Sequence, residues 1–399
     1  MTASRVEGRL DALYAIGGGE GANRPALSAH EDAAHALAWG WMREAGLETG
    51  TDAIGNLYGR LRGREPGLAE IWCGSHLDSV PRGGRFDGAL GVVAALEAVS
   101  RLEPGARTVT VVAFRDEEGC RFGDGFLGSR AVSGQLDATG LENADRDGVT
   151  VREALAAGGH PFTPGDGWLV PAPAAFVEAH IEQGPALAGQ DAALGVVTSI
   201  VGILELQAVF AGAAGHAGTT PMANRRDAAL CAAAFQVAAA AAARDIADAV
   251  VTVGSAIAVE PGAANVIARR TTVRLDARAP DAERLAALER AVWAAADEAA
   301  QAHGCEAQVD VTMRIDPVAC DPALRDVLGR AAAGAPSLPS GAGHDAQVLA
   351  RAGVPVAMLF VRSLNGGISH SPAESSSRED VAACVDALEA ALRELTDRR

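Results

Sequence analysis

Residues 71–91 read IWCGSHLDSVPRGGRFDGALG, and this stretch decides the fold of the chain. It begins with the apolar run IWC, which is typical of a buried strand, and an apolar helical pattern starts at Ala89. His76, Asp78 and Asp87 lie between the two. Polar side chains that follow a strand and precede a helix occupy the place where open α/β sheets bind ligands. The stretch therefore predicts an α/β fold with a ligand site at the end of this strand.

The polar residues of this stretch suit a divalent metal ion. His76 offers a neutral imidazole and Asp87 a carboxylate, a mixture of ligands that zinc and similar ions bind. Asp78 is better placed to accept the other imidazole N–H of His76, as partners of metal-bound histidines do. A His-x-Asp string is common by itself, so this prediction depends on what the rest of the chain supplies.

Length and composition limit the class of protein. The 399 residues favour two domains, or one large domain with an insertion, and 49% of them are apolar, enough for a full core. The net charge of −17, without any basic block, argues against nucleic acid or membrane partners. No stretch has the pattern of a transmembrane helix or a signal peptide. The six cysteines form no CxxC pair, which is usual in a reducing compartment, so we expect a cytoplasmic protein.

Three later predicted strands are also followed by acidic or histidine side chains: 108–114 by Glu117 and Glu118, 175–179 by His180, and 355–361 by His370. A helix predicted at 92–102 joins the first of these strands to the strand before His76, and strand–helix–strand order indicates a parallel sheet. Each group alone fits a solvated turn, but their recurrence favours a two-metal site. In such a site Asp87 is the natural bridge, one glutamate binds metal, and the other is a general base that deprotonates water.

The pattern changes between residues 201 and 316. The predicted elements are strand 203–210, helix 224–243, strand 250–259, strand 271–277, helix 281–303 and strand 306–315. This β-α-β-β-α-β order is that of a ferredoxin-like α+β sandwich. Because the parallel-sheet pattern resumes after Pro317, we predict an inserted domain, 201–316, within a discontinuous catalytic domain, 1–200 and 317–399. Surface loops with one short helix, 151–157, are expected over residues 123–174.

The motifs of the chain exclude some enzyme classes and resemble another. No phosphate-binding loop, dinucleotide-binding fingerprint or GxSxG elbow occurs. Seven motifs follow one another along the chain: GSHLDSVPRGGRFDGALG, FRDEEGCRF, EAHIEQGP, GHAGTTPM with RRDA, NVI with LDAR, SGAGHDA and NGGISHSPAE. Through them the chain resembles the hydantoinase/carbamoylase branch of the M20 di-metal amidohydrolase and peptidase family. That branch includes N-carbamoyl-L-amino acid hydrolases, β-ureidopropionase and allantoate amidohydrolase.

The resemblance implies a role for each matching residue. The metal ligands would be His76, Asp87, Glu118, His180 and His370, with Asp87 as the bridge. The catalytic residues would be Glu117 as general base, Asp78 as partner of His76, and His216, which can donate to the oxyanion. A histidine at 180 favours this branch, because carboxypeptidase-like members of the family carry an acid there.

The resemblance also implies substrate-binding positions. They are Gln183, His216, Asn265 and Arg278. A guanidinium binds a carboxylate through two parallel hydrogen bonds, which fits Arg278 to a ureido acid. For His216 the resemblance leaves two alternatives, the site of its own subunit and that of a partner subunit. His344 and Asp345 are expected either to have a structural role or to contact the metal ligands without binding the metal themselves.

Fold, cofactors and reaction follow from the same resemblance. It implies a di-metal exopeptidase-like catalytic domain, with a central mixed sheet flanked by helices, and an inserted domain that acts as lid and homodimer interface. Two divalent ions are expected per subunit, zinc first, with manganese, cobalt or nickel as alternatives. The implied reaction hydrolyses the ureido C–N bond of N-carbamoyl-L-amino acids to the amino acid, ammonia and carbon dioxide. Alternatives are an allantoate or ureidoglycolate amidohydrolase, a β-ureidopropionase or, more remotely, a metal-free binding protein of the same fold.

Overall fold

The computed structural model describes residues 2–165 and 172–398. The chain divides into two compact units. Unit 1 comprises Met1–Thr198, Cys320–Leu338 and His344–Arg399, and unit 2 comprises Ser199–Ala319 and Pro339–Gly343. The sequence did not indicate that the short segment Pro339–Gly343 would join unit 2. Residues 166–171, which fall within the expected surface loops, lie outside the described residues.

Unit 1 is built on a mixed sheet. Its strands are β1 (Glu48–Thr51), β2 (Leu57–Leu61), β3 (Ile71–His76), β4 (Val109–Phe114), β5 (Ala175–Ile181), β6 (Leu194–Ile200) and β13 (Val356–Val361), in the spatial order β1-β2-β4-β3-β5-β13-β6. The central strands β4, β3, β5 and β13 are parallel, and β1, β2 and β6 are antiparallel to their neighbours. β12 (Ser337–Ser340) and β11 (Val318–Ala319) also pair with β6. The predicted α/β class with a central mixed sheet is confirmed.

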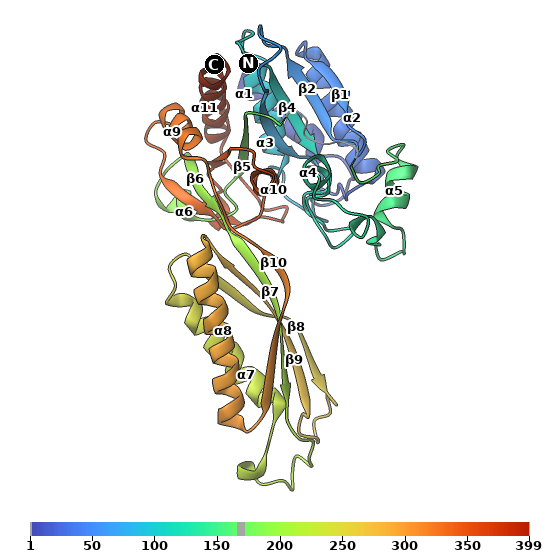
Figure 1. Cartoon of the computed structure of the whole chain (residues 1–399), viewed down its shortest axis with the longest axis vertical. Helices are drawn as coiled ribbons and strands as arrows, with labels where there is room; N and C mark the ends of the chain where they lie inside the picture. Colours follow the sequence, from blue (N-terminus) through green and yellow to red (C-terminus); the bar gives the residue numbers. More distant parts are fainter. Residues whose placement is uncertain (1, 166–171, 399) are drawn as a thin grey trace. The chain divides into compact units, whose positions relative to one another are not determined.

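The two faces of this sheet have different roles. One face forms the large apolar core with α1 (Thr2–Tyr14), α2 (Ala29–Glu44), α3 (Ala89–Val99), α9 (Pro322–Ala331) and α11 (Arg378–Asp397) (Figure 1). The other meets the shorter helices α4 (Leu127–Val132) and α10 (Asp345–Arg351). On β5, Glu178 and His180 alternate with the core residues Val177, Ala179 and Ile181, so they point to this second face.

Local sequence explains where several helices begin. Ser28 caps α2, and Thr150 with Glu153 forms a capping box at the start of α5 (Val151–Ala157), the short helix that the sequence predicts. α3 begins at Ala89, where the apolar helical pattern of the sequence starts, because the chain turns into it at Gly88 (φ 62°). It ends at Val99, three residues before the predicted end at 102. α4, α9 and the four-residue α6 (Ala186–Gly189) were not predicted.

Unit 2 contains six main elements: β7 (Gly202–Ala211), α7 (Ala228–Arg244), β8 (Val250–Glu260), β9 (Arg270–Ala279), α8 (Ala282–His303) and β10 (Glu306–Ile315). The strands form an antiparallel sheet in the order β10-β7-β9-β8. α7 and α8 pack on each other and on one face of that sheet around a separate apolar core (Figure 1). Asp227 caps α7, which therefore starts four residues after the predicted position.

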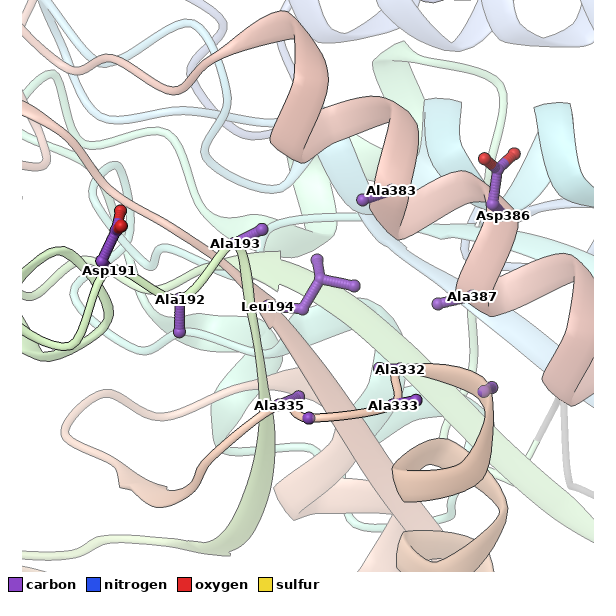
Figure 2. A pocket seen from close by; sticks show the side chains of 12 residues that line it. Asp191, Ala192, Ala193, Leu194, Ala332, Ala333, Ala335, Ala383, Asp386 and Ala387 are labelled. Atoms are coloured by element: carbon purple, nitrogen blue, oxygen red, sulfur yellow. The ribbon is translucent and has the colours of Figure 1, made fainter.

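Unit 1 also has a surface hollow of about 520 Å³ between the segment Asp191–Leu194, the end of α9 and α11. Alanine side chains line most of it, and the carboxylates of Asp191 and Asp386 stand at its edges (Figure 2). None of its lining residues is a predicted site residue. Among the described helices, none is long and apolar enough to cross a membrane.

Candidate metal centre

The five predicted ligands converge in unit 1. His76 ends β3, Asp87 precedes α3, Glu118 follows β4, His180 lies near the end of β5 and His370 follows β13. They form two groups, His76–Asp87–His180 and Asp87–Glu118–His370, and within each group the ligand atoms lie within 4.8 Å of one another. The carboxylate of Asp87 belongs to both groups.

The two oxygens of Asp87 face different histidines. Oδ1 lies 3.3 Å from Nε2 of His180 and 3.7 Å from Nε2 of His76. Oδ2 lies 3.3 Å from Nε2 of His370, which is itself 3.4 Å from Oε2 of Glu118. A carboxylate with one oxygen toward each ligand group is suited to bridge two cations.

The burial of these residues indicates that a cation fits them. His76, Asp87 and His180 are buried, and Glu118 is nearly so, whereas His370 is 51% exposed. Nε2 of His76 and Oε1 of Glu118 are buried without a hydrogen-bond partner in the described part of the chain. Such atoms are rare in folded proteins. His76 belongs to one ligand group and Glu118 to the other, so a metal ion in each group would give both unpartnered atoms a partner. Imidazole and carboxylate ligands suit zinc, manganese, cobalt and nickel.

The electrostatics of the cluster favour added positive charge. Burial disfavours a charged His76, but the nearby carboxylates of Glu117, Asp78 and Asp87 outweigh it and raise the pKa of His76 well above its usual value. Burial likewise disfavours a charged Asp87, yet hydrogen bonds with His180 and His370 hold its pKa well below the usual range. The field of the carboxylates therefore attracts either protons or divalent cations to the imidazoles.

Glu117 and Glu118 have different surroundings although they are adjacent. Glu118 lies in a ligand group, whereas Glu117 lies in neither, with its Oε2 3.8 Å from Nε2 of His76. Burial raises the pKa of Glu117 well above its usual value; the charge of His76 opposes this rise and that of Glu118 adds to it. Burial and then the charge of Asp87 raise the pKa of Glu118 to about 7. Glu117 thus remains available to exchange protons beside the ligands.

Asp78 connects one histidine to the glutamate turn. One carboxylate oxygen lies 3.1 Å from Nδ1 of His76 and accepts the backbone N–H of Glu117 at 3.0 Å. The other accepts the N–H of Glu118 at 3.2 Å. These bonds leave Nε2 of His76 directed at Asp87. The structure thus brings Asp78 into contact with both His76 and the glutamate turn.

Glu374 is a supporting residue that the sequence did not single out. Its Oε2 accepts the backbone N–H groups of Phe86 (2.7 Å) and Asp87 (3.1 Å), and its Oε1 accepts the hydroxyl of Ser369 at 2.8 Å. Gln183, predicted to bind substrate, donates from Nε2 to Oδ2 of Asp87 at 3.0 Å. Glu374 ends the motif NGGISHSPAE, so its place four residues after His370 was a usable signal.

A third group lies next to the first and comprises Glu178, His180 and His344. The rings of His180 and His344 pack edge to face with centroids 4.6 Å apart. Burial, followed by the charge of His180, holds the pKa of His344 well below its usual value, so this imidazole is neutral. Glu178 accepts hydrogen bonds from Ser75 Oγ (2.7 Å) and Ala346 N (3.0 Å). Glu178 was not predicted from the sequence as a site residue, although it lies two residues before His180 on the same face of β5.

The remaining predicted residues belong to unit 2. His216 forms a β-bridge with Val266, and the N–H of Ala217 donates to the carbonyl of Asn265 at 3.0 Å, so His216 and Asn265 lie in neighbouring loops. These loops follow β7 and precede β9, beyond the pair Ala211–Arg270.

Arg278 lies at the opposite end of the same sheet, paired with Ile203. Arg270 lies eight residue steps before it along β9, which corresponds to roughly 27 Å at about 3.4 Å per residue. Its guanidinium donates from Nε and Nη2 to the carboxylate of Asp276, at 2.8 Å and 3.1 Å, and from Nη1 to the carbonyl of Gly341 at 3.1 Å. Within unit 2, therefore, Arg278 is far from His216 and Asn265.

Histidines and carboxylates that share an aspartate at the ends of parallel strands define the class of metal-dependent hydrolases. Residues 72–394 match Peptidase family M20/M25/M40, and the chain belongs to that family, as the motifs predict. An N-carbamoyl-L-amino acid amidohydrolase from Geobacillus stearothermophilus is 40% identical over 378 residues, 92% of each chain. Allantoate amidohydrolase from Escherichia coli (strain K12) is 37% identical over 369 residues, 89% of this chain and 88% of that one.

Solved structures agree with this membership. The crystal structure of an amidase of the hydantoinase/carbamoylase family from Burkholderia multivorans has a TM-score of 0.91 to this chain, with 34% identity, and the match covers 99% of this chain and 98% of that one. The likeness extends over both units of the chain, so the whole fold is that of this group of amidases.

Proposed function

We propose that the chain is a metal-dependent amidohydrolase that cleaves the ureido C–N bond of N-carbamoyl-L-amino acids, releasing the amino acid, ammonia and carbon dioxide. The observation that carries the proposal is the carboxylate of Asp87, shared by two ligand groups, with Glu117 buried beside them and outside both. The names of the relatives support the substrate class. Those named for N-carbamoyl-L-amino acids are 37–40% identical, and those named for allantoate are 34–37% identical.

The proposed cofactors are two divalent ions, with zinc first among the alternatives. His76 and His180 would hold one ion, Glu118 and His370 the other, and Asp87 would bridge them. When bound, such ions polarise the substrate carbonyl and lower the pKa of water toward neutrality. Asp78 keeps the proton of His76 on Nδ1, so that Nε2 is free to act as a ligand.

Glu117 is the proposed proton carrier. It accepts a proton from the attacking water and delivers it to the leaving nitrogen of the ureido group, as a general base and then a general acid do. The carbamic acid left on the other nitrogen then breaks its own C–N bond and loses carbon dioxide, so that the amino acid and ammonia are both freed. Only 10% of the Glu117 side chain is exposed, which limits the competition of bulk water for the transferred proton. Gln183 is a proposed substrate-binding residue, and its contacts with Asp87 and Ser369, beside the proposed metal ligands, support this role.

The residues of unit 2 support a site that is completed by a second copy of the chain. Arg278 would bind the substrate carboxylate, and His216 and Asn265 would bind the reacting end. The roughly 27 Å of strand between Arg278 and the other two exceeds the length of a small ureido acid. We propose that each site uses Arg278 from one copy of unit 2 and His216 with Asn265 from the other.

The surface of unit 2 supports a homodimer. α7 carries only one polar residue, Gln236, between Ala228 and its final Arg244, so it is apolar on all sides, as helices at interfaces are. Val237 on this helix is 74% exposed. β8, at the sheet edge and in contact with α7, exposes Ile257 (50%) and Val259 (40%). An exposed apolar edge strand invites pairing with another chain.

The test of the substrate class is ammonia release by protein loaded with Zn²⁺ or Mn²⁺. The panel contains N-carbamoyl-L-methionine, N-carbamoyl-β-alanine, allantoate and a dipeptide, with Glu117→Gln as control. We expect turnover of the carbamoyl-L-amino acid and its loss in the control. Turnover of allantoate alone would favour the second candidate, an allantoate amidohydrolase, which the relative from Escherichia coli supports. No turnover of any ureido acid by fully metallated protein would refute the proposal.

A further inference from the structure

Arg24 is the largest fully buried side chain that the structure describes, with 1% of its surface exposed. It lies in the segment between α1 and α2 and belongs to none of the motifs discussed above. A buried guanidinium is costly unless hydrogen bonds and nearby negative charge compensate for the lost hydration. The surroundings of Arg24 show what provides this compensation.

Hydrogen bonds attach Arg24 to the residues on both sides of Asp78. Its Nε donates to the carbonyl of Leu77 at 2.6 Å. Its backbone N–H donates to Oγ of Ser79 at 3.0 Å, and its backbone carbonyl accepts the N–H of Ser79 at 3.0 Å. Its Nη1 donates to the carbonyl of Leu13 in α1 at 3.0 Å. Arg24 thus fixes the segment 77–79 against the N-terminal helix.

That segment in turn positions the candidate metal centre. Asp78, between the two residues that Arg24 binds, contacts the ring of His76 and accepts the backbone N–H groups of Glu117 and Glu118. A displacement of Asp78 would therefore move a proposed ligand of each ion and the proposed base together. Arg24 is thus connected to His76, Glu117 and Glu118 through the short segment 77–79.

The cluster in turn acts on the charge of Arg24. Its Nη2 is buried without a hydrogen-bond partner among the described residues. Burial lowers the pKa of Arg24, and the negative charges of Asp78, Asp87 and Glu118 oppose that effect. Since a guanidinium stays protonated in proteins, Arg24 is a permanent positive charge within the field of these carboxylates, which offsets the cost of its burial.

We propose that Arg24 is a positioning residue for the metal centre: it holds the segment 77–79, and with it Asp78, in place against α1. This inference rests on the proposed metal centre, and it makes a prediction about metal affinity that does not depend on turnover. Arg24 touches neither substrate nor metal in this scheme, and it acts through Asp78.

The test compares Arg24→Met and Arg24→Lys with a matched buried arginine. Arg9 is 9% exposed, pairs with Glu97 at 3.5 Å and also has a guanidinium nitrogen, Nη1, without a hydrogen-bond partner among the described residues, but it has no bond to the segment 77–79. Metal affinity is measured on the apo-proteins by competition for Zn²⁺ with a chromophoric chelator. Hydrogen exchange of the amides of Glu117 and Glu118 provides a second readout.

We expect Arg24→Met to weaken Zn²⁺ binding roughly tenfold or more, the range found when outer partners of metal ligands are removed. Exchange at the two glutamate amides should rise in the same variant. Arg24→Lys keeps the charge but loses the planar fork, so we expect an intermediate loss, and Arg9→Met should bind Zn²⁺ like the wild type.

Wild-type affinity and amide protection in folded Arg24→Met would overturn the proposal, as would an equal loss in Arg9→Met. If Arg24→Met does not fold, wild-type affinity and protection in Arg24→Lys would overturn it as well. Wild-type protein that binds Zn²⁺ but hydrolyses no ureido acid would refute only the proposed function. Wild-type protein that binds no divalent ion would refute both.

Discussion

One carboxylate oxygen of Asp78 lies 3.1 Å from Nδ1 of His76 and also accepts the backbone N–H of Glu117, so one side chain sets the position of a proposed ligand and of the proposed base. We expect Asp78→Asn to lower metal affinity about 10- to 100-fold, because an amide can replace only one of the two accepting oxygens. Chelator competition on the apo-protein measures the effect.

The control for this substitution is Asp52→Asn. Asp52 also accepts several hydrogen bonds, from Ile54, Asn56 and Tyr58, but has no contact with the ligands. The Asp52→Asn variant should be less stable than the wild type but should bind metal with wild-type affinity. Equal metal affinity in both variants would contradict the role assigned to Asp78.

Gly88 leaves no room for a side chain. An added Cβ would lie 2.4 Å from Cε1 of His76, and φ is +62°. Gly18 has nearly the same φ, +63°, with nothing within 4 Å of an added Cβ. Both alanine variants should lose about 1–2 kcal/mol of stability from the left-handed backbone.

The two variants should differ in metal binding. Gly88→Ala alone must displace the ring of His76, so we expect at least a tenfold loss of metal affinity in that variant and none in Gly18→Ala. Thermal unfolding and zinc titration separate the two effects. Wild-type zinc binding by Gly88→Ala would show that the ring of His76 is not required where the structure places it.

Metal binding should depend on pH in a defined direction. A hydrogen bond with Asp87 and the charge of Glu118 raise the pKa of His370 to about 9, against the effect of burial, and the pKa of Glu118 is raised to about 7. Both groups must lose a proton before they can bind a metal. Apparent Mn²⁺ affinity should therefore rise as the pH increases from 6 to 9.

Calorimetry in two buffers of different ionisation enthalpy checks this pH dependence, since it counts the protons that Mn²⁺ binding releases. With ordinary pKa values of 4.5 and 6.5 for the same two groups, the affinity would level off near pH 7. A plateau there, without proton release at pH 8, would contradict the electrostatic description of the cluster.

The proposed dimer depends on one edge of unit 2. Ile257→Glu on β8 places a charge at the exposed apolar edge, and we expect it to convert the dimer to a monomer in sedimentation experiments. Val311→Glu on β10, the opposite edge strand, is the control and should leave the dimer intact. If the Ile257 variant stays dimeric, the contact between subunits is formed elsewhere.

Much of the fold followed from local sequence. The apolar run 356–361 is unbroken over the whole strand because the central strands are buried on both faces. The helix α4 was missed because it has only six residues, too few to show a helical period. α9 did carry usable signals: Asp321 caps it, Pro322 occupies its first turn, and Leu324, Val327 and Leu328 recur at helical spacing.

The candidate site shows the same division. His76, Asp87 and His180 were found because each ends or follows a strand, and their chemistry is visible in the residue type. Arg24 and Glu374 were missed because they bind backbone groups far away along the chain. Arg24 binds Leu77, at a separation of 53 positions, and Glu374 binds Asp87, at a separation of 287 positions. Only the folded chain creates these contacts. Sequence motifs thus indicate candidate reacting groups, whereas the groups that hold those candidates in place are visible only in the structure.

The most direct measurement of the central claim is ammonia release from N-carbamoyl-L-methionine while Zn²⁺ is added stepwise to apo-protein. The account predicts no release without metal, a rise that ends near two equivalents per chain, and no release by Glu117→Gln at the same metal content. Release by metal-free protein, or full activity in metal-loaded Glu117→Gln, would contradict it.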